Sequence, residues 1–201
     1  MRATDDEIRE KYLERAIREL NLLAHDIQDC ELCPRGGIMP VLGSGHPQAD
    51  IMLVKTAPVA AEVEEGVAFY GKAGTALMKA LKRLQIDPLT VYGSLLCKCP
   101  CGDPALADPE CIARFREEFA IVQPKLLVVM GDDAVTTIND LALPMAEPID
   151  ATPGVLRKLT GSCDVLVTTS IDDSLDDETA KRAFWAAFRQ TGEWYAAHPP
   201  Y

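Results

Sequence analysis

Cysteine spacing constrains the possible folds of this chain more than any other feature of its sequence. Two residues separate Cys30 from Cys33, and a second group of thiols follows much later in the chain. The short turn within Cys-x-x-Cys can direct both sulfurs to one metal centre, and a later pair can complete a four-thiolate site. A metal centre of this kind would require the fold to bring two distant segments together. The second group comprises Cys97, Cys99, Cys101 and Cys111.

The cysteines alone leave the nature of the centre open. Zinc and an iron–sulfur cluster both accept four thiolates. The irregular spacing of the second group disfavours a plain zinc ribbon, which has two repeated Cys-x-x-Cys knuckles. The alternative to a metal centre is a set of small buried apolar side chains, which is what most free cysteines are. The chain has seven cysteines, and an odd number argues against a framework of disulfides.

Length and composition predict a single domain over residues 1–201, because the chain has no internal repeat and no low-complexity tract. Residues 1–20 are highly charged and no apolar run reaches the length of a membrane span. We therefore expect a cytoplasmic protein, monomeric and without a signal peptide or a membrane partner.

The net charge of −11 argues against tight DNA binding, because phosphate contacts require basic side chains. Basic residues nevertheless gather in the middle third of the chain. They form either a local patch for nucleic acid or, as is more common, a solvated helix face. They are Lys55, Lys72, Lys79, Lys82, Arg83 and Lys98.

Short apolar runs alternate with helical patterns along the chain. Four of these runs have strand length and suit strands that are buried on both faces. The alternation predicts an α/β fold, a three-layer sandwich with a mainly parallel four-stranded central sheet. The predicted strands lie near residues 51–55, 91–96, 126–130 and 165–169.

Helices are expected between and around these strands. A capping box from Thr4 to Glu7, followed by apolar residues at helical spacing, predicts an N-terminal helix at about residues 4–28. Asp108 and the proline after it predict another helix start, which places Cys111 in a first turn. Further helices are expected at 75–86, at 132–139 and from 176 to about 189, before a short C-terminal tail at about 192–201.

From about residue 28 to residue 190 the motifs resemble those of the iron–sulfur uracil-DNA glycosylases of family 4. That family runs Cys-x-x-Cys, then a strand ending in Gly-Glu-Ala-Pro-Gly, then Glu-Asp-x-x-Gly-x-Pro-Phe-Val-Gly-x-Ala-Gly. A later strand ends in Asn-x-x-Lys-Cys, and a last cysteine opens a helix that leads through Pro-Lys to an apolar strand. The corresponding segments here are Lys55-Thr-Ala-Pro-Val59, Glu62-Val63, Gly66, Ala68-Phe-Tyr-Gly71, Ala73-Gly74, Leu95-Leu-Cys-Lys-Cys99, Cys111, Pro124-Lys125 and Gly131.

The resemblance implies a [4Fe-4S] cluster, with zinc as the alternative. The family's four ligands fall on Cys30, Cys33, Cys99 and Cys111. Cys97 and Cys101 are additional thiols. Alternation along the strand is expected to place both on the same face as Cys99, so either could replace it as a ligand.

The resemblance also implies a cleft that holds a flipped nucleotide. Its substrate-contacting positions would be Ala57, Pro58, Phe69, Gly71 and Leu95, with Phe69 as the aromatic side chain that stacks on the base.

Four positions of this cleft depart from the family pattern. The family's acidic residue is Thr56, which cannot act as a carboxylate base, and its second glycine is Val59. The asparagine that would read the uracil edge is Leu95, and the histidine that stabilises the leaving uracil is Ser170. A later His-Pro pair at residues 198–199 lies too far along the chain to replace that histidine.

We therefore expect a uracil-DNA glycosylase-like [4Fe-4S] protein of the DNA base-excision repair class, with weak or absent uracil excision. If active, it would be a hydrolase of the N-glycosidic bond, with Glu62 as a possible substitute base. The alternative is a non-catalytic module that holds a nucleotide, a nucleic acid or a protein in the same cleft. DNA or a nucleotide is thus an expected partner despite the acidic net charge.

Overall fold

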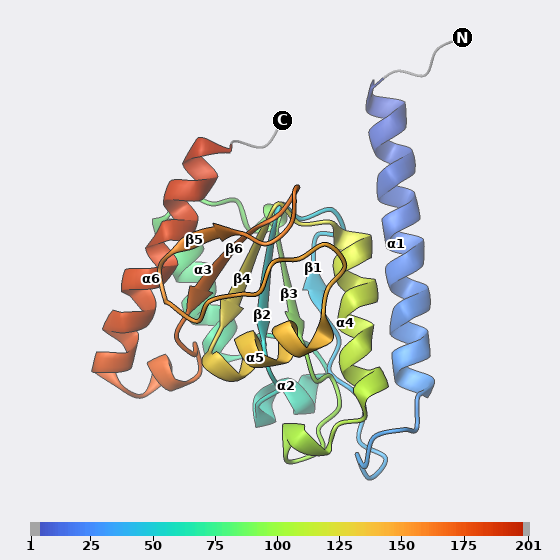
Figure 1. The fold of residues 1–201 in the computed structure, drawn as a ribbon. Helices are drawn as coiled ribbons and strands as arrows, with labels where there is room; N and C mark the ends of the chain where they lie inside the picture. The colour runs from blue at the N-terminus through green and yellow to red at the C-terminus, as the bar shows by residue number, and fades with distance from the viewer. Residues whose placement is uncertain (1–4, 199–201) are drawn as a thin grey trace.

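A mixed sheet lies between two layers of helices in the computed structural model, which describes residues 5–198 (Figure 1). The sheet has six strands in the order β1-β3-β2-β4-β6-β5. The four central strands are parallel, whereas both edge strands run antiparallel to their neighbours. The strands are β1 (Ser44–Gly45), β2 (Ile51–Lys55), β3 (Val91–Leu95), β4 (Leu126–Met130), β5 (Leu156–Lys158) and β6 (Asp164–Thr168).

The α/β prediction is confirmed, and the four predicted strands are the four central ones. Every residue of β2, β3 and β4 is buried, as parallel strands covered on both faces require. The predicted width of four strands is wrong, because β1 and β5 extend the sheet at its two edges. These strands have only two and three residues and contain no buried apolar run that could have marked them in the sequence.

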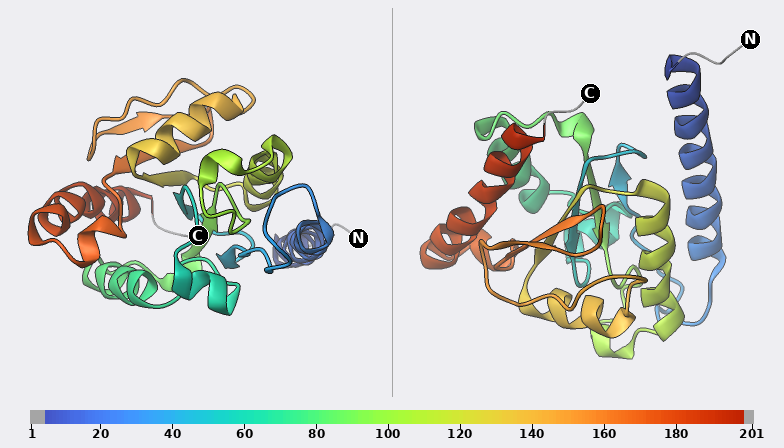
Figure 2. Two further views of the ribbon diagram at one scale, coloured as in Figure 1. Left: turned by 90° about the horizontal axis from the view of Figure 1, so that it is seen from below. Right: turned by 45° about the horizontal axis from the view of Figure 1, so that its top comes forward.

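Two helices cover each face of the sheet. α3 and α6 lie on one face and α4 and α5 on the other, with α1 packed outside α4 (Figures 1 and 2). The sheet and these two layers make the predicted sandwich. The helices are α1 (Asp5–Asp29), α2 (Ala60–Glu65), α3 (Lys72–Arg83), α4 (Pro109–Val122), α5 (Asp132–Leu141) and α6 (Glu178–Ala197).

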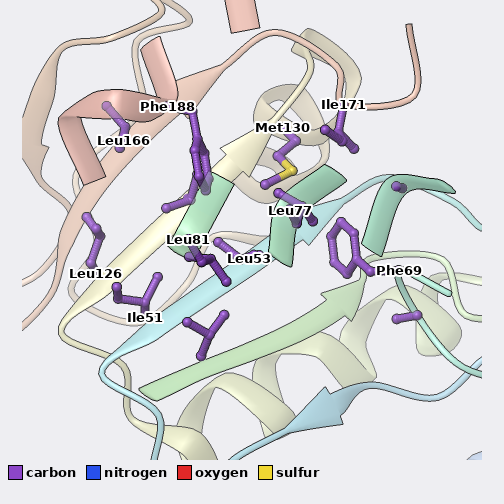
Figure 3. Packing of buried hydrophobic residues seen from close by; sticks show 14 of the residues in the cluster. Ile51, Leu53, Phe69, Leu77, Leu81, Leu126, Met130, Leu166, Ile171 and Phe188 are labelled. Atoms are coloured by element: carbon purple, nitrogen blue, oxygen red, sulfur yellow. The ribbon is translucent and has the colours of Figure 1, made fainter. Parts of the chain in front are cut away.

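Alternation along each strand divides the core into two clusters. Ile51 and Leu53 of β2 face the layer of α3 and α6, whereas Met52 and Val54 face the layer of α4 and α5. Figure 3 shows the first cluster, in which Phe188 of α6 lies over the sheet. The ring of Phe188 stacks on that of Phe184 with 5.2 Å between centroids.

The apolar stripe of α1 is covered only in its second half. Leu23 and Ile27 are buried, whereas Ile8 and Tyr12 are exposed on the part of the helix that extends beyond the body (Figure 1). Thr4, the first residue of the predicted capping box, lies outside the described residues. Although α1 has 25 residues, neither it nor any other helix of the described part is apolar enough to cross a membrane.

The C-terminal helix is longer than the sequence predicted. α6 continues through Ala197, so the tail expected from residue 192 is helical over most of its described part. The extension is stabilised by Trp194, whose ring is buried and whose Nε1 donates to Asp164 Oδ2 at 2.9 Å. The predicted helix ended too early because the contact that stabilises the extension, between Trp194 and Asp164, joins α6 to a different element.

We expect Phe188→Ala to lower the free energy of unfolding by about 3–5 kcal/mol, because the ring is fully buried and its removal leaves a cavity. Chemical denaturation followed by circular dichroism measures the change. Met145→Ala is the matched control, since Met145 is 92% exposed and its truncation removes almost no buried area. Equal destabilisation by the two variants would contradict the assigned core.

Candidate functional site

Three buried cysteines from distant segments converge at one end of the sheet. The sulfurs of Cys33, Cys99 and Cys111 all lie within 4.8 Å of one another. Cys33 follows α1, Cys99 follows β3, and Cys111 lies in the first turn of α4, where Asp108 caps the helix as predicted. A group of thiols this close can hold a metal, and sulfur ligands favour zinc or an iron–sulfur centre.

The other thiols nearby are placed differently. Cys97 is buried in the same cluster, and its Sγ donates to the carbonyl oxygen of Cys99 at 3.2 Å. Cys101 is half-buried against the cluster, whereas Cys30 is half-buried and, within the described residues, outside the group of three sulfurs. The structure therefore brings together three of the four cysteines that the resemblance implied.

Strand alternation does not govern the second cysteine group. β3 ends at Leu95, and the chain beyond it is a loop that is tied back to β2 and the segment after it. Leu96 donates its N–H to the carbonyl of Lys55 at 3.0 Å, and Cys97 donates to the carbonyl of Thr56 at 2.7 Å. The expectation that strand alternation would align Cys97 and Cys101 with Cys99 is therefore wrong, because no strand extends that far.

Contacts among the thiols lower the pKa of Cys111 and raise the pKa of its sulfur neighbours. Side-chain hydrogen bonds with Cys97 and Cys99, with further donation from the backbone N–H groups of Lys98 and Cys99, lower the pKa of Cys111 to about 2. Burial raises the pKa of Cys33 to about 11, even though the Asp108 N–H donates to its sulfur at 3.3 Å. Donation to Cys111, followed by burial, raises the pKa of both Cys97 and Cys99.

Several thiolates this close together and buried from water would repel one another unless a positive charge compensated them. A metal supplies that charge, and binding to thiolates releases the remaining protons. The donor set and its burial therefore fit a thiolate-bound metal.

A buried ion pair connects two of the cysteine-bearing segments. Lys98, between Cys97 and Cys99, has 0% exposure, and its Nζ lies 2.7 Å from Glu118 Oε2 on α4. The same ammonium donates to Ser94 Oγ at 2.8 Å and to the Leu95 carbonyl at 2.9 Å. The loop that carries Cys99 is thus joined to the helix that carries Cys111.

A second buried ion pair lies beyond the carboxyl end of β2. Lys55, the last residue of β2, is 4% exposed, and its Nζ lies 2.8 Å from both Glu62 Oε2 and Asp172 Oδ2. The ammonium also lies 5.6 Å from the ring centroid of Phe69. Lys55 and Lys98 therefore belong to the interior, and only the α3 members of the basic group in the sequence are exposed.

Glu62 is fully buried and its two oxygens have structural partners. Oε2 accepts the N–H of Val59 at 2.8 Å and Oε1 accepts the N–H of Phe69 at 2.6 Å. With Lys55 these partners hold both ends of the loop that contains α2. This carboxylate does not lie on a solvated loop surface.

Glycines allow Phe69 to lie flat against the sheet. Phe69 has a positive φ of 59°, and its ring packs on Gly93 of β3, where an added Cβ would come within 2.6 Å of Cδ2. A Cβ at Gly74 would collide with the Phe69 carbonyl oxygen. Figure 3 shows Phe69 beside the end of β3, with Leu77 of α3 nearby.

The remaining predicted positions surround this end of the sheet. Thr56 is half-buried and lines a cavity of 550 Å³ together with Cys97. Leu95 is fully buried next to Lys55 in the strand register, and Ser170 Oγ accepts the N–H of Asp173 at 3.3 Å.

The other four predicted positions lie along the loop after β2. Ala57 packs on the cysteine cluster, Pro58 is half-buried and Val59 is exposed before α2. Gly71 precedes α3 with a positive φ of 83°.

Sequence reasoning missed Lys55 and Asp172. A charged residue at the end of an otherwise apolar strand was a usable signal for Lys55, because a buried charge requires a partner. Asp172 had no comparable signal, since 117 residues separate it from Lys55.

We expect Lys98→Met to lower the free energy of unfolding by about 3–5 kcal/mol, because it leaves the Glu118 carboxylate buried without its cation. Denaturant titration measures the loss. The matched control is Arg157→Met, which breaks a half-exposed pair with Asp150 and should cost about 1 kcal/mol or less. Equal costs for the two variants would show that the Lys98 pair does not stabilise the fold.

Comparisons with known proteins agree with this architecture. Residues 42–189 match the family model described as the Uracil DNA glycosylase superfamily. The matched segment is well over half of the chain. A protein named type-4 uracil-DNA glycosylase from Pyrobaculum aerophilum is 27% identical over 144 residues, which are 68% of this chain and 72% of that protein.

Two further relatives carry the same name. The Sulfurisphaera tokodaii protein is 29% identical over 125 residues, and the Saccharolobus solfataricus protein is 28% identical over 123 residues. Each match covers 56% of this chain and 54% or 55% of the relative, so the chain spans little more than half the length of these two proteins. With the family model matched over most of the sheet and helices, the chain belongs to the uracil-DNA glycosylase superfamily, as a divergent member related to the type-4 enzymes.

Proposed function

We propose that this protein is an iron–sulfur member of the superfamily in which excision of uracil from DNA is weak or absent. The observation that carries the proposal is the Lys55 ammonium, held 2.8 Å from both Glu62 and Asp172 at the end of β2. In the family pattern this motif begins with glycine and continues with the acidic residue, whereas here a lysine is followed by Thr56. A buried cation with two carboxylate partners therefore occupies the position at which the family pattern has glycine.

Hydrolysis of an N-glycosidic bond needs a base to activate water and a group to stabilise charge on the leaving base. Thr56 has only a neutral hydroxyl at the position of the family's acidic residue. Ser170 stands where the pattern has histidine, and a hydroxyl cannot carry the positive charge of an imidazolium. Neither the base that activates water nor the group that stabilises the leaving base is present at its expected position.

Glu62 is poorly suited to replace the missing base. Its oxygens already accept two backbone N–H groups and contact the Lys55 ammonium. Glu62 has 0% exposure, so a water molecule could reach the carboxylate only if the surrounding loop opened. These contacts support a structural role for Glu62 in shaping the loop.

Recognition of uracil is weakened for a separate reason. Leu95 stands where the pattern has the asparagine that reads the base edge, and it is completely buried. A polar base edge facing an apolar side chain loses its hydrogen bonds, at about 1–3 kcal/mol for each unsatisfied group. We therefore expect selectivity for uracil to be lost together with the excision activity.

The same Lys55 contacts support a second candidate, a module with no hydrolytic activity that binds a nucleotide, a nucleic acid or a protein. It differs from the first candidate only in the residual rate of excision. An excision assay therefore separates the two.

We further propose that Cys30, Cys33, Cys99 and Cys111 hold a [4Fe-4S] cluster. The support is the buried all-sulfur group of three thiols and its agreement with the type-4 pattern. A bound cluster would cross-link the loop after α1, the loop after β3 and α4. Cys97, which is already buried among these thiols, is the alternative fourth ligand, and zinc is the alternative metal.

Anaerobically purified protein should be brown, contain iron and absorb broadly near ~400 nm, as thiolate-bound iron clusters do. We expect Cys111→Ala to lose the iron and much of the stability, because metal binding is coupled to folding. Cys163→Ala is the matched control, since Cys163 is buried in the other core cluster and should leave the iron content unchanged.

Separate Cys30→Ala and Cys97→Ala variants identify the fourth ligand by their iron content. Colourless wild-type protein with stoichiometric zinc and no iron would contradict the cluster assignment.

We expect no detectable uracil excision, or a rate reduced by at least ~10²–10³, which is the effect of losing a single electrostatic stabiliser. The measurement is a gel assay with uracil-containing single-stranded and duplex DNA, and the same sequences without uracil are the substrate control. Combining Lys55→Gly, Thr56→Glu, Leu95→Asn and Ser170→His tests whether the remaining cleft supports excision once the pattern is restored.

Rapid cleavage by wild-type protein that Glu62→Gln abolishes would refute the proposal and identify Glu62 as the base. Slow cleavage that Glu62→Gln leaves unchanged would favour the weak enzyme over the inactive module.

A further inference from the structure

The buried ion pair at the end of β2 contains more negative than positive charge. A single ammonium, that of Lys55, lies 2.8 Å from carboxylate oxygens of both Glu62 and Asp172. Among residues 5–198, no second cation forms an ion pair with either carboxylate. One negative charge is therefore uncompensated at a site where Lys55 and Glu62 are shielded from water, and a cationic ligand would be attracted more strongly there than at the surface.

The two carboxylates differ in how completely their oxygens are used. Both oxygens of Glu62 have donors, since Oε1 accepts from Phe69 and Oε2 from Val59. Asp172 Oδ2 contacts Lys55, whereas Asp172 Oδ1 is buried and has no hydrogen-bond partner in the described part of the chain. A buried acceptor without a donor is rare in folded proteins and calls for a bound water or ligand. The Asp172 side chain is 28% exposed, so a ligand can approach it from outside, which the fully buried Glu62 does not allow.

An aromatic ring lies beside these charges. The centroid of the Phe69 ring is 5.6 Å from the Lys55 ammonium, and the Phe69 N–H is held by Glu62 at 2.6 Å. Phe69 also lines a cavity of 900 Å³, which gives a planar ligand room next to the ring. Aromatic rings stack on planar groups and attract cations. The ring, the free oxygen of Asp172 and the excess negative charge therefore all favour a planar cation that carries a hydrogen-bond donor.

We propose that this cleft binds a cationic N-alkylated purine base and hydrolyses its N-glycosidic bond. Such a base is planar and positively charged, and its exocyclic amino group can donate to Asp172 Oδ1. The inference rests on the proposed function, because it uses the same cleft, and deepens it by naming a substrate class in place of uracil.

The charge of such a base removes the two requirements that the cleft does not meet for uracil. When the C1′–N bond breaks, its electron pair passes to the base nitrogen and cancels the positive charge, so the base leaves as a neutral molecule. Water adds to the electron-poor C1′ and gives one proton to the solvent. Excess carboxylate charge stabilises the positive charge that moves from the base to the sugar. No imidazolium is then needed at Ser170 and no carboxylate base at Thr56, whereas uracil would leave as an anion that the same negative charge disfavours.

The ligand class is tested by isothermal titration calorimetry of the full-length, anaerobically purified protein. The probes are 7-methylguanosine, in mildly acidic buffer that keeps its ring cationic, and neutral guanosine. We expect wild type to bind 7-methylguanosine roughly tenfold or more tightly than guanosine. Asp172→Asn should abolish most of this preference, whereas Asp172→Glu, which keeps the charge, should retain part of it. Asp173→Asn is the matched control, because it removes the same charge from an exposed neighbour and should bind like wild type.

The excision step is tested with DNA that has been methylated with dimethyl sulfate. Chromatography measures the 7-methylguanine and 3-methyladenine that are released, and DNA without protein gives the spontaneous rate. We expect wild type to accelerate release above this rate, and Asp172→Asn to reduce the acceleration roughly tenfold or more. The Asp173→Asn control should release both bases like wild type.

Three outcomes would overturn the inference: equal affinity of wild type for the two nucleosides, a preference that survives Asp172→Asn, or base release no faster than without protein. Uracil excision is measured on separate, unmethylated DNA, so failure here leaves the proposed weakness of uracil excision untouched. Rapid uracil excision would refute that proposed function, while the two nucleoside affinities would still decide the ligand class.

Discussion

Pairing between β2 and β3 is the constraint on which the thiol cluster and the buried ion pair of Lys55 both depend. The two strands are in parallel register up to Lys55 and Leu95, and the hydrogen bonds continue beyond the strands. Leu96 and Cys97 donate their N–H groups to the carbonyls of Lys55 and Thr56. The segment that opens the cleft and the segment that carries the cysteines are therefore one hydrogen-bonded unit. A metal that stabilises the cysteine loop also stabilises the first residues of the cleft.

Two buried lysines next to this hydrogen-bonded unit are stabilised in the same way, by a close carboxylate. Lys55 is neutralised by Glu62 and Asp172, and Lys98 is neutralised by Glu118. Burying each charge has a desolvation cost of several kcal/mol, and only a close carboxylate with good geometry offsets it. The carboxylates in these pairs are therefore committed to the fold. These contacts support the proposal that Glu62, although it lies next to Phe69, does not act as a catalytic base.

The electrostatic character of the molecule is divided between its surfaces. The cysteine-bearing side gathers buried thiols that could hold a metal ion, whereas α3 presents exposed cations on the opposite face of the sheet. The cleft beside Phe69 lies at the end of the sheet between these regions. The replacement of the family's polar positions by Thr56, Leu95 and Ser170 supports the proposal of a protein without efficient hydrolysis of uracil from DNA.

The amino-acid sequence by itself determined the four central strands, the placement of Cys111 in a first helical turn and the family resemblance. Local signals suffice for these features: apolar runs define buried strands, and Asp108 followed by proline defines a helix start. The two edge strands and the end of α6 could not be predicted, because short exposed strands have no apolar run and α6 is extended by the contact of Trp194 with Asp164. Only the tertiary structure decided that Lys55 and Lys98 are buried, that both oxygens of Glu62 have partners and that Cys97 belongs to the buried thiol cluster. Each of these outcomes depends on a partner far away in the chain, and the sequence around a charged or sulfur-bearing side chain does not state which distant group will meet it.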